Sequence, residues 1–130
     1  MNATLEFHDS EVCNVELNAN SLTVVFSAAN VHRPDGQSGG DAIAGYVQSL
    51  EMKFSDATWI GPVAECMGRL SAGKVVANGV ARSRLELPSA FTGNVSAELQ
   101  FSNGSQLSIT ATALECHLTG EAKFVEAFRC

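Results

Sequence analysis

The chain has 130 residues, 45% of them hydrophobic, which is ordinary for one globular domain and argues against a disordered segment. Its formal net charge of -6 disfavours general binding of nucleic acids, because their phosphate backbones repel an acidic surface. No stretch approaches the roughly 18 apolar residues of a membrane span, and no signal-peptide pattern is present, so we expect a cytoplasmic protein without membrane contact.

Alternating apolar and polar residues predict strands from the start of the chain. Leu5 and Phe7 mark a first short strand. The runs Cys13–Leu17 and Leu22–Phe26 lie on either side of Asn18-Ala19-Asn20, an arrangement typical of a β-hairpin.

Residues Asn30–Gly45 form one long irregular stretch that contains four glycines. Loops longer than about 12 residues are uncommon in compact domains and are often functional. This stretch carries four candidate binding residues, His32, Arg33, Asp35 and Asp41. A guanidinium such as that of Arg33 suits a carboxylate or a phosphate. The alternative is a surface excursion without a function.

Strand patterns continue through the middle of the chain. Tyr46–Phe54 predicts a strand, Thr58–Ile60 a short β-prone segment, and residues 63–68 fit a single helical turn. Trp59, the only tryptophan, is expected to pack at the rim of the core. A partly exposed ring beside the 30–45 loop would instead contact a sugar or a partner.

Two Asn-Gly pairs, at 78–79 and 103–104, each lie between alternating runs, which is the strongest short-range signal of a β-hairpin. The strand expected after the first pair, Val80–Leu87, carries Arg82 and Arg84 on one face. These arginines indicate either a solvated strand face or a contact with an acidic partner.

The last long run changes phase. Its apolar residues occupy odd positions up to Ala113 and even positions from Leu114 onward. Because a strand has a period of two, we predict a β-bulge or a sharp bend at this point. The tail from Glu121 is expected to be a final strand or extended segment.

These patterns predict a single all-β domain over residues 1–130, with about eight to ten strands and hairpin connections. An antiparallel meander of this size curls into a closed β-barrel or folds into a β-sandwich. The sequence does not decide between the two.

Two short motifs contain the residue types of catalytic sites, and strand geometry argues against both. His8-Asp9-Ser10 holds the side chains of a hydrolase triad, but on a strand the middle residue faces away from the other two. In Glu115-Cys116-His117 the cysteine would face the core while its neighbours face solvent. We therefore predict no catalytic residue, no metal site and no cofactor.

The four cysteines, Cys13, Cys66, Cys116 and Cys130, have no spacing typical of a zinc site or a redox pair. Cys13 and Cys116 occupy apolar positions in their strands, so we expect reduced thiols that act as small hydrophobic residues. Cys130 is expected to be the most exposed and oxidisable of the four.

Two further motifs carry a resemblance. Phe7-His8-Asp9-Ser10 before a hairpin, and Leu118–Ala122 followed by Phe124–Glu126, resemble features of small uncharacterised bacterial proteins. This resemblance implies a bacterial, single-domain β protein and supplies no catalytic residues. In size, acidity and β content the chain is also similar to the immunity proteins of bacterial toxin systems, a likeness that implies no particular site.

The sequence favours a non-enzymatic protein-interaction module, an acidic β scaffold that contacts its partner through the 30–45 loop and neighbouring strand ends. The candidate binding residues are His32, Arg33, Asp35, Asp41 and Trp59. An acidic surface would attract a basic protein partner. The alternative is a small-ligand-binding barrel or sandwich with a pocket under that loop. Homodimer formation through an exposed edge strand also stays open.

Overall fold

The computed structural model describes residues 3–34 and 42–129, and it confirms the all-β class. Its strands are β1 (Ala3–Asn18), β2 (Ser21–Pro34), β3 (Ala42–Ser55), β4 (Thr58–Ile60), β5 (Gly68–Ala77), β6 (Val80–Arg82), β7 (Arg84–Leu87), β8 (Ser89–Phe101) and β9 (Gln106–Arg129). The only helical segment within these residues is a 3-10 turn, η1 (Val63–Glu65), which lies where the sequence predicts a helical turn.

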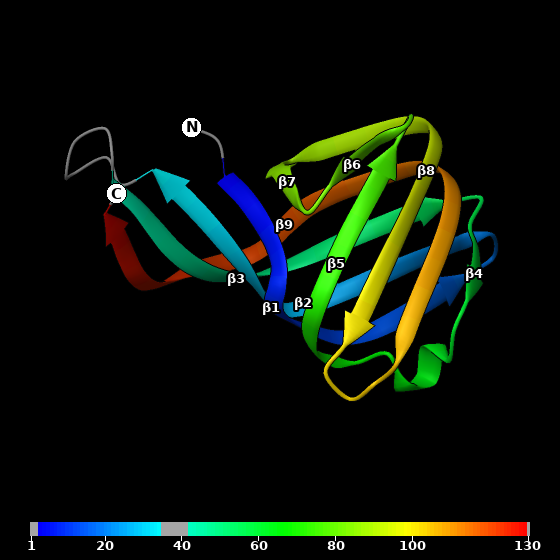
Figure 1. The fold of residues 1–130 in the computed structure, drawn as a ribbon, viewed down its shortest axis with the longest axis horizontal. Helices are drawn as coiled ribbons and strands as arrows, with labels where there is room; N and C mark the ends of the chain where they lie inside the picture. Colours follow the sequence, from blue (N-terminus) through cyan, green and yellow to red (C-terminus); the bar gives the residue numbers. More distant parts are fainter. Residues whose placement is uncertain (1–2, 35–41, 130) are drawn as a thin grey trace.

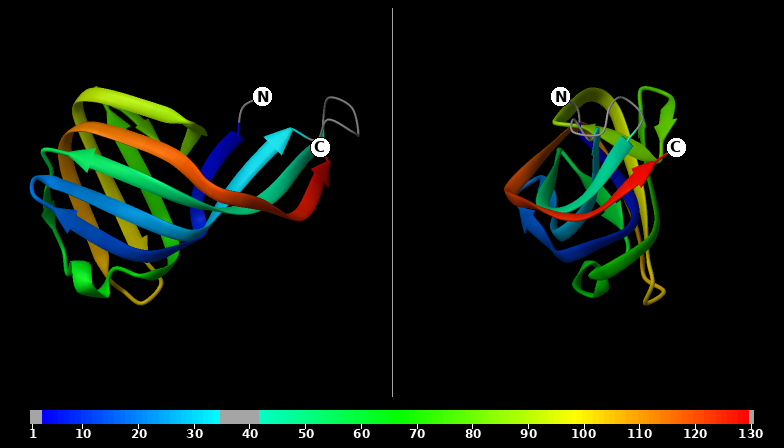
Figure 2. Two further views of the ribbon diagram at one scale, coloured as in Figure 1. Left: turned by 180° about the vertical axis from the view of Figure 1, so that it is seen from behind. Right: turned by 90° about the vertical axis from the view of Figure 1, so that its left-hand side faces the viewer.

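Six strands pair side by side in a closed ring, in the order β1–β2–β3–β9–β8–β5, which makes the architecture barrel-like (Figures 1 and 2). The ring closes where β5 pairs with β1, through Glu11 with Arg69 and Val12 with Gly68. From this crossing toward Ala3 of β1 and Ala77 of β5, the two strands diverge (Figure 1). The space between them is spanned by β6, which pairs with β5, and β7, which pairs with β1.

The inward-facing positions of the ring form one apolar core. Its largest fully buried side chains are Phe7, Phe26, Phe54, Leu5, Leu22, Leu50, Met52, Leu70, Leu85, Leu99, Leu107 and Ile109. Phe7 on β1 lies directly against Gly73 on β5, because a Cβ atom added to Gly73 would come within 2.8 Å of Cβ and Cγ of Phe7. The missing side chain therefore lets β5 and β1 approach each other near the ring closure.

Most of the stretch expected to be a loop is paired strand. The ladder between β2 and β3 runs from Asn30 with Val47 to Pro34 with Ile43. The expected 30–45 loop is therefore wrong for residues 30–34 and 42–45. Residues 30–34 pair with 43–47 and Ala42 pairs with Arg129, although the side chains alternate poorly. Residues 35–41, with Asp35 and Asp41, lie outside the described part of the chain.

The two strands expected near the start of the chain are one long strand, β1, interrupted by a bulge. Asp9 has φ 66, and the pairing of β1 with β2 shifts between Glu6 and Glu11. The bulge changes the inward-facing residues of β1 from odd-numbered to even-numbered positions, so Val12 is buried and Cys13 is exposed. The expectation that Cys13 faces the core is wrong for this reason.

The predicted irregularity near residues 113 and 114 is confirmed in position. Buried positions change from odd to even between Ala111 and Leu114, and the pairing of β8 with β9 shifts at the same place. The extra residue lies on β8, where Gly93 has φ 107. The predicted extended tail is also confirmed, since β9 continues through Arg129.

The single strand expected at Val80–Leu87 is broken. Arg82 is the last residue paired with β5, Ser83 forms a bend, and Arg84 is the first residue paired with β1. Arg82 and Arg84 therefore lie on two strands that belong to different neighbours.

Candidate functional site

The ends of three strands project from the barrel as an arm. The arm consists of residues 29–34 of β2, 42–48 of β3 and 119–129 of β9, and it extends to the left of the barrel in Figure 1. Its strands are hydrogen-bonded in the order β2–β3–β9. The arm carries the described part of the stretch in which the sequence places its candidate binding residues.

One long edge of the arm is open. β9 pairs with β8 as far as Cys116, which lies opposite Ser89, and with β3 as far as Arg129. From His117 onward, no described strand pairs with the side of β9 that faces away from β3. This part of β9 therefore presents backbone N–H and C=O groups on which a further strand can pair.

A polar cluster fastens the three strands of the arm together at its root. Arg33 on β2 donates a hydrogen bond from Nη2 to Oε1 of Gln48 on β3 at 2.9 Å. Gln48 in turn donates from Nε2 to the carbonyl oxygen of Gly120 on β9 at 2.9 Å. The Arg33 guanidinium also stacks 5.3 Å from the ring centroid of Tyr46. The arm thus has side-chain cross-links in addition to its backbone ladder.

The register of the ladder explains this cluster. Val31 lies opposite Tyr46 and Arg33 opposite Ala44, so Arg33 is the diagonal neighbour of Tyr46 on the same face. Gln48 continues the even-numbered series of buried residues on β3, and it is itself buried. A polar residue in an otherwise apolar inward series is the signal by which sequence reasoning could have found Gln48.

His32 faces the other side of the sheet from Arg33, as expected for neighbours on one strand. Its Nδ1 lies 3.5 Å from Oε2 of Glu6 on β1. The same carboxylate oxygen lies 3.6 Å from Nη2 of Arg84 on β7. His32 and Arg33 are thus adjacent in sequence but belong to two separate polar clusters.

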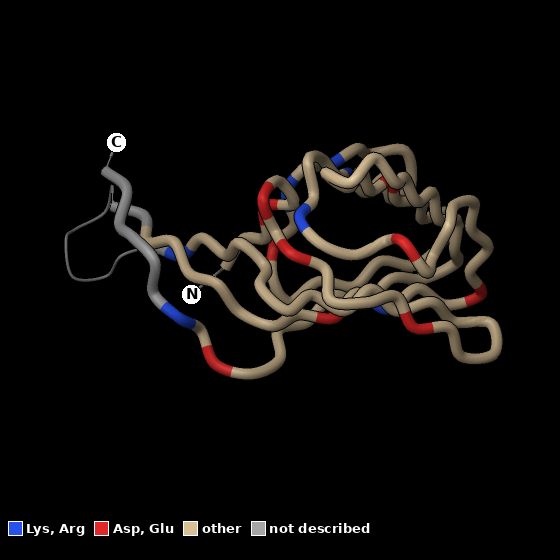
Figure 3. The backbone as a smooth tube through the Cα atoms, turned by 90° about the horizontal axis from the view of Figure 1, so that it is seen from below, with Lys and Arg blue, Asp and Glu red and all other residues tan. Residues whose placement is uncertain are grey.

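The middle of the open edge is irregular. Thr119 lies opposite Ser49 and Lys123 opposite Val47, so β9 has two more residues than β3 in this interval. Gly120 has φ 70, and Figure 3 shows the chain bowing outward along the arm. A bulge together with the exposed charges of Glu121 and Lys123 is a common protection of an edge strand against indiscriminate pairing.

Trp59 does not belong to the arm. It lies on β4, opposite Ile109 of β9, and packs against the core. In Figure 1 β4 is at the end of the barrel away from the arm. Trp59 thus has the rim-packing position that the sequence favours, and the alternative of a ring beside residues 30–34 and 42–45 is wrong.

Neither catalytic-looking motif forms a reactive constellation. His8 Nδ1 donates to the carbonyl oxygen of Ser71 at 2.9 Å, and its Nε2 lies 3.4 Å from Oδ2 of Asp9. Ser10 is buried elsewhere, because Oγ donates to the carbonyl of Glu6 at 2.6 Å and accepts the N–H of Asn30 at 2.8 Å. The serine hydroxyl is thereby used to satisfy backbone groups at the bulge of β1.

Glu115-Cys116-His117 follows the predicted geometry, with Cys116 buried and both neighbours exposed. Within the described residues, no group of three or more His, Cys, Asp or Glu side chains is placed to hold a metal ion. The same part of the chain contains no helix with the length and apolarity of a membrane span, and the cytoplasmic location stays a prediction.

No protein-family model, curated protein or solved structure matches this chain. The resemblances to small bacterial proteins and to toxin-immunity proteins therefore stay predictions, and the functional argument rests on the geometry of the arm and the barrel.

Proposed function

We propose that this protein is a non-enzymatic interaction module that binds a partner protein through the arm, by adding a strand of the partner to the open edge of β9. The observation that carries the proposal is the unpaired side of β9 from His117 to Arg129, on strands that project beyond the barrel. Backbone pairing of this kind supplies affinity through main-chain hydrogen bonds.

The bulge divides the edge into two parts with different roles. Residues 119–123 deviate from regular pairing and carry Glu121 and Lys123, which disfavours pairing there. Residues 124–129 follow this bulge and continue the ladder with β3 to the end of β9, with one further register shift between Phe124 and Glu126. We therefore assign the partner strand to the 124–129 backbone.

Stiffness of the arm supports this role. The links from Arg33 to Gln48 and from Gln48 to Gly120 tie the arm's three strands together at its root. An edge that is already ordered loses less conformational entropy on binding than a flexible segment does. The partner is a protein other than a second copy, because the guarded middle of the edge disfavours self-pairing.

Site-specific photo-crosslinking tests the proposal in cells of the native host. Lys123 on β9 and Lys74 on β5 are both exposed lysines, and each is replaced separately by p-benzoylphenylalanine. We expect irradiation to link a defined partner to the position-123 variant and not to the position-74 variant. Hydrogen exchange of the purified complex should then show new protection of amides within residues 124–129.

Three results would contradict the proposal. Adducts of equal yield at both positions would show that the arm is not the contact surface. New amide protection confined to the barrel would show the same. An adduct with the mass of two copies of this chain would identify self-association in place of a partner protein.

A further inference from the structure

A groove lies at the end of the barrel where β1 and β5 diverge. β6 pairs with β5 as far as Arg82, the chain bends at Ser83, and β7 pairs with β1 from Arg84 onward. After Pro88 the chain runs beside β9 as the start of β8. These segments surround a groove of about 700 Å³. This volume lies within the range of roughly 300–1,000 Å³ that small-molecule sites occupy.

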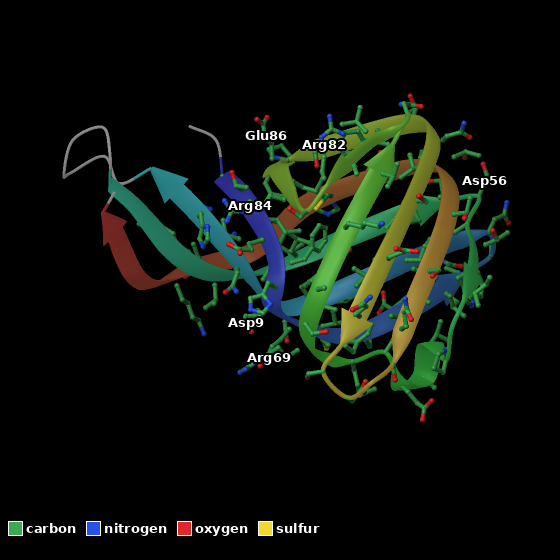
Figure 4. The ribbon with its side chains drawn as sticks, in the orientation of Figure 1. Asp9, Asp56, Arg69, Arg82, Arg84 and Glu86 are labelled. Atoms are coloured by element: carbon green, nitrogen blue, oxygen red, sulfur yellow. The ribbon has the colours of Figure 1, made fainter. Side chains whose placement is uncertain are left out.

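Two arginines face this groove from neighbouring strands (Figure 4). The half-buried Arg82 stacks over Phe91 of β8, with its guanidinium carbon 5.0 Å from the ring centroid. No carboxylate of the described residues forms an ion pair with Arg82. Stacking covers the face of a guanidinium and leaves the N–H groups in its plane free to donate.

The pairing of Arg84 is weak. Its Nη2 lies 3.6 Å from Oε2 of Glu6, and 62% of its side chain is exposed. An exposed pair of this length contributes at most about 1 kcal/mol, so a ligand anion can compete for Arg84.

Ser89 also lines the groove, but its hydroxyl does not face the open space. Its Oγ is buried and makes no hydrogen bond, one of two such side-chain atoms in the described part of the chain. Buried hydroxyls are nearly always hydrogen-bonded in native proteins. Because this oxygen has almost no accessible surface, a ligand in the groove would not reach it, and we assign it no part in binding.

We infer that this groove is a binding site for a small organic monoanion with a carboxylate and a flat apolar body. Arg82 and Arg84 would donate to the carboxylate, and the body would lie along Pro88 and Phe91. Glu86 also lines the groove, and its negative charge disfavours a dianion such as phosphate. This site is independent of the proposed role of the arm.

Titration of the full chain with benzoate, followed by amide chemical shifts, tests the inference. Acetate, benzyl alcohol and inorganic phosphate serve as ligands that lack, respectively, the apolar body, the carboxylate and the single charge. The titrations are run near pH 8, where phosphate is mostly the dianion. We expect benzoate to shift the amides of residues 82–91 and to bind more tightly than each of the other three.

Variants separate ligand binding from folding. Arg82→Gln should weaken benzoate binding by about tenfold or more, the size expected for a lost charge-assisted hydrogen bond. Arg69→Gln, an exposed arginine away from the groove in Figure 4, should leave binding unchanged. Glu86→Gln should strengthen binding by about two- to threefold because it removes a repulsive charge.

Ser89→Ala is a control in the wall of the groove. It should leave benzoate binding unchanged and the melting temperature unchanged or higher, since a buried hydroxyl without a partner costs stability. Arg82→Lys keeps the positive charge but loses the planar guanidinium. Its affinity for benzoate should lie between those of the wild type and Arg82→Gln.

The inference is overturned if benzoate at a concentration of tens of millimolar shifts no amide between residues 82 and 91. A Kd of that size is roughly the weakest that a specific site would have. Equal binding by wild type and a folded Arg82→Gln variant would also overturn it. So would phosphate binding as tight as benzoate binding.

Discussion

Replacing Gly73 by valine should destabilise the protein by an amount at or above the upper end of the roughly 1–3 kcal/mol typical of overpacked cores. A side chain at this position meets Cβ and Cγ of Phe7 at 2.8 Å, and these atoms cannot swing away because they are at the base of a fully buried ring. β5 must therefore move away from β1, close to where the two strands complete the ring. Urea unfolding measures this loss as a lower midpoint.

Two controls connect the effect to this contact. Ala72→Val adds methyl groups at the neighbouring exposed position of β5 and should change stability little. Phe7→Ala costs about 3–5 kcal/mol by itself, but in that background Gly73→Val should cost less than in wild type. If the two substitutions are additive, the contact between β1 and β5 is not as described.

Cys116→Val should remove much of the protein's loss of stability at alkaline pH. Burial raises the pKa of Cys116 from its ordinary value of 9.0 to about 12. The unfolded thiol ionises first, so its contribution is fully present below pH 9 and is lost as pH rises toward 12. The difference between the two pKa values is worth at most about 4 kcal/mol.

The free energy of unfolding, measured by urea titration between pH 8 and pH 11, checks this expectation. The wild-type value should fall more steeply with pH than that of Cys116→Val. Cys13→Ser, at an exposed thiol, should follow the wild-type curve. Burial and the nearby Glu65 carboxylate also raise the pKa of Cys66, so the Cys116→Val curve keeps a residual slope. Parallel curves for wild type and Cys116→Val would contradict the burial of this thiol.

Local alternation was sufficient to predict the strands whose partners lie nearby in sequence. The hairpin of β1 with β2 pairs Val15 with Val24 and Leu17 with Leu22, as the pattern indicates. The burial of Cys116 between two exposed neighbours follows from the same rule. In these places each residue's face is set by the period of two.

The rule fails where the backbone leaves the regular strand conformation. Asp9 adopts a positive φ, which shifts the inward positions so that Val12 replaces Cys13 in the core. The sequence does not predict this bulge, because an aspartate or asparagine at positive φ is as common in turns as in bulges and does not distinguish them. The break between Arg82 and Arg84 has a similar origin, since it reflects a change of partner strand from β5 to β1.

The candidate sites depended on contacts between residues distant in sequence. Arg33 was found as a candidate from its residue type, but its links through Gln48 to Gly120 require the register of three strands. The groove was missed as a site because Arg82 and Phe91 come together only when β8 returns past the turn at Ser83. Local sequence patterns also do not predict the ring closure between β1 and β5, because the paired residues are far apart in the sequence.

Amide hydrogen exchange along β9 in the isolated chain tests most directly that this strand leaves the barrel with one edge uncovered. Residues 108–110 and 113–116 pair on both sides and should exchange slowly throughout, whereas in residues 117–129 amides that point away from β3 should exchange much faster than those that point toward it. Uniformly slow exchange from residue 107 to residue 129 would mean that another strand already covers this edge, and the proposed binding surface would not exist.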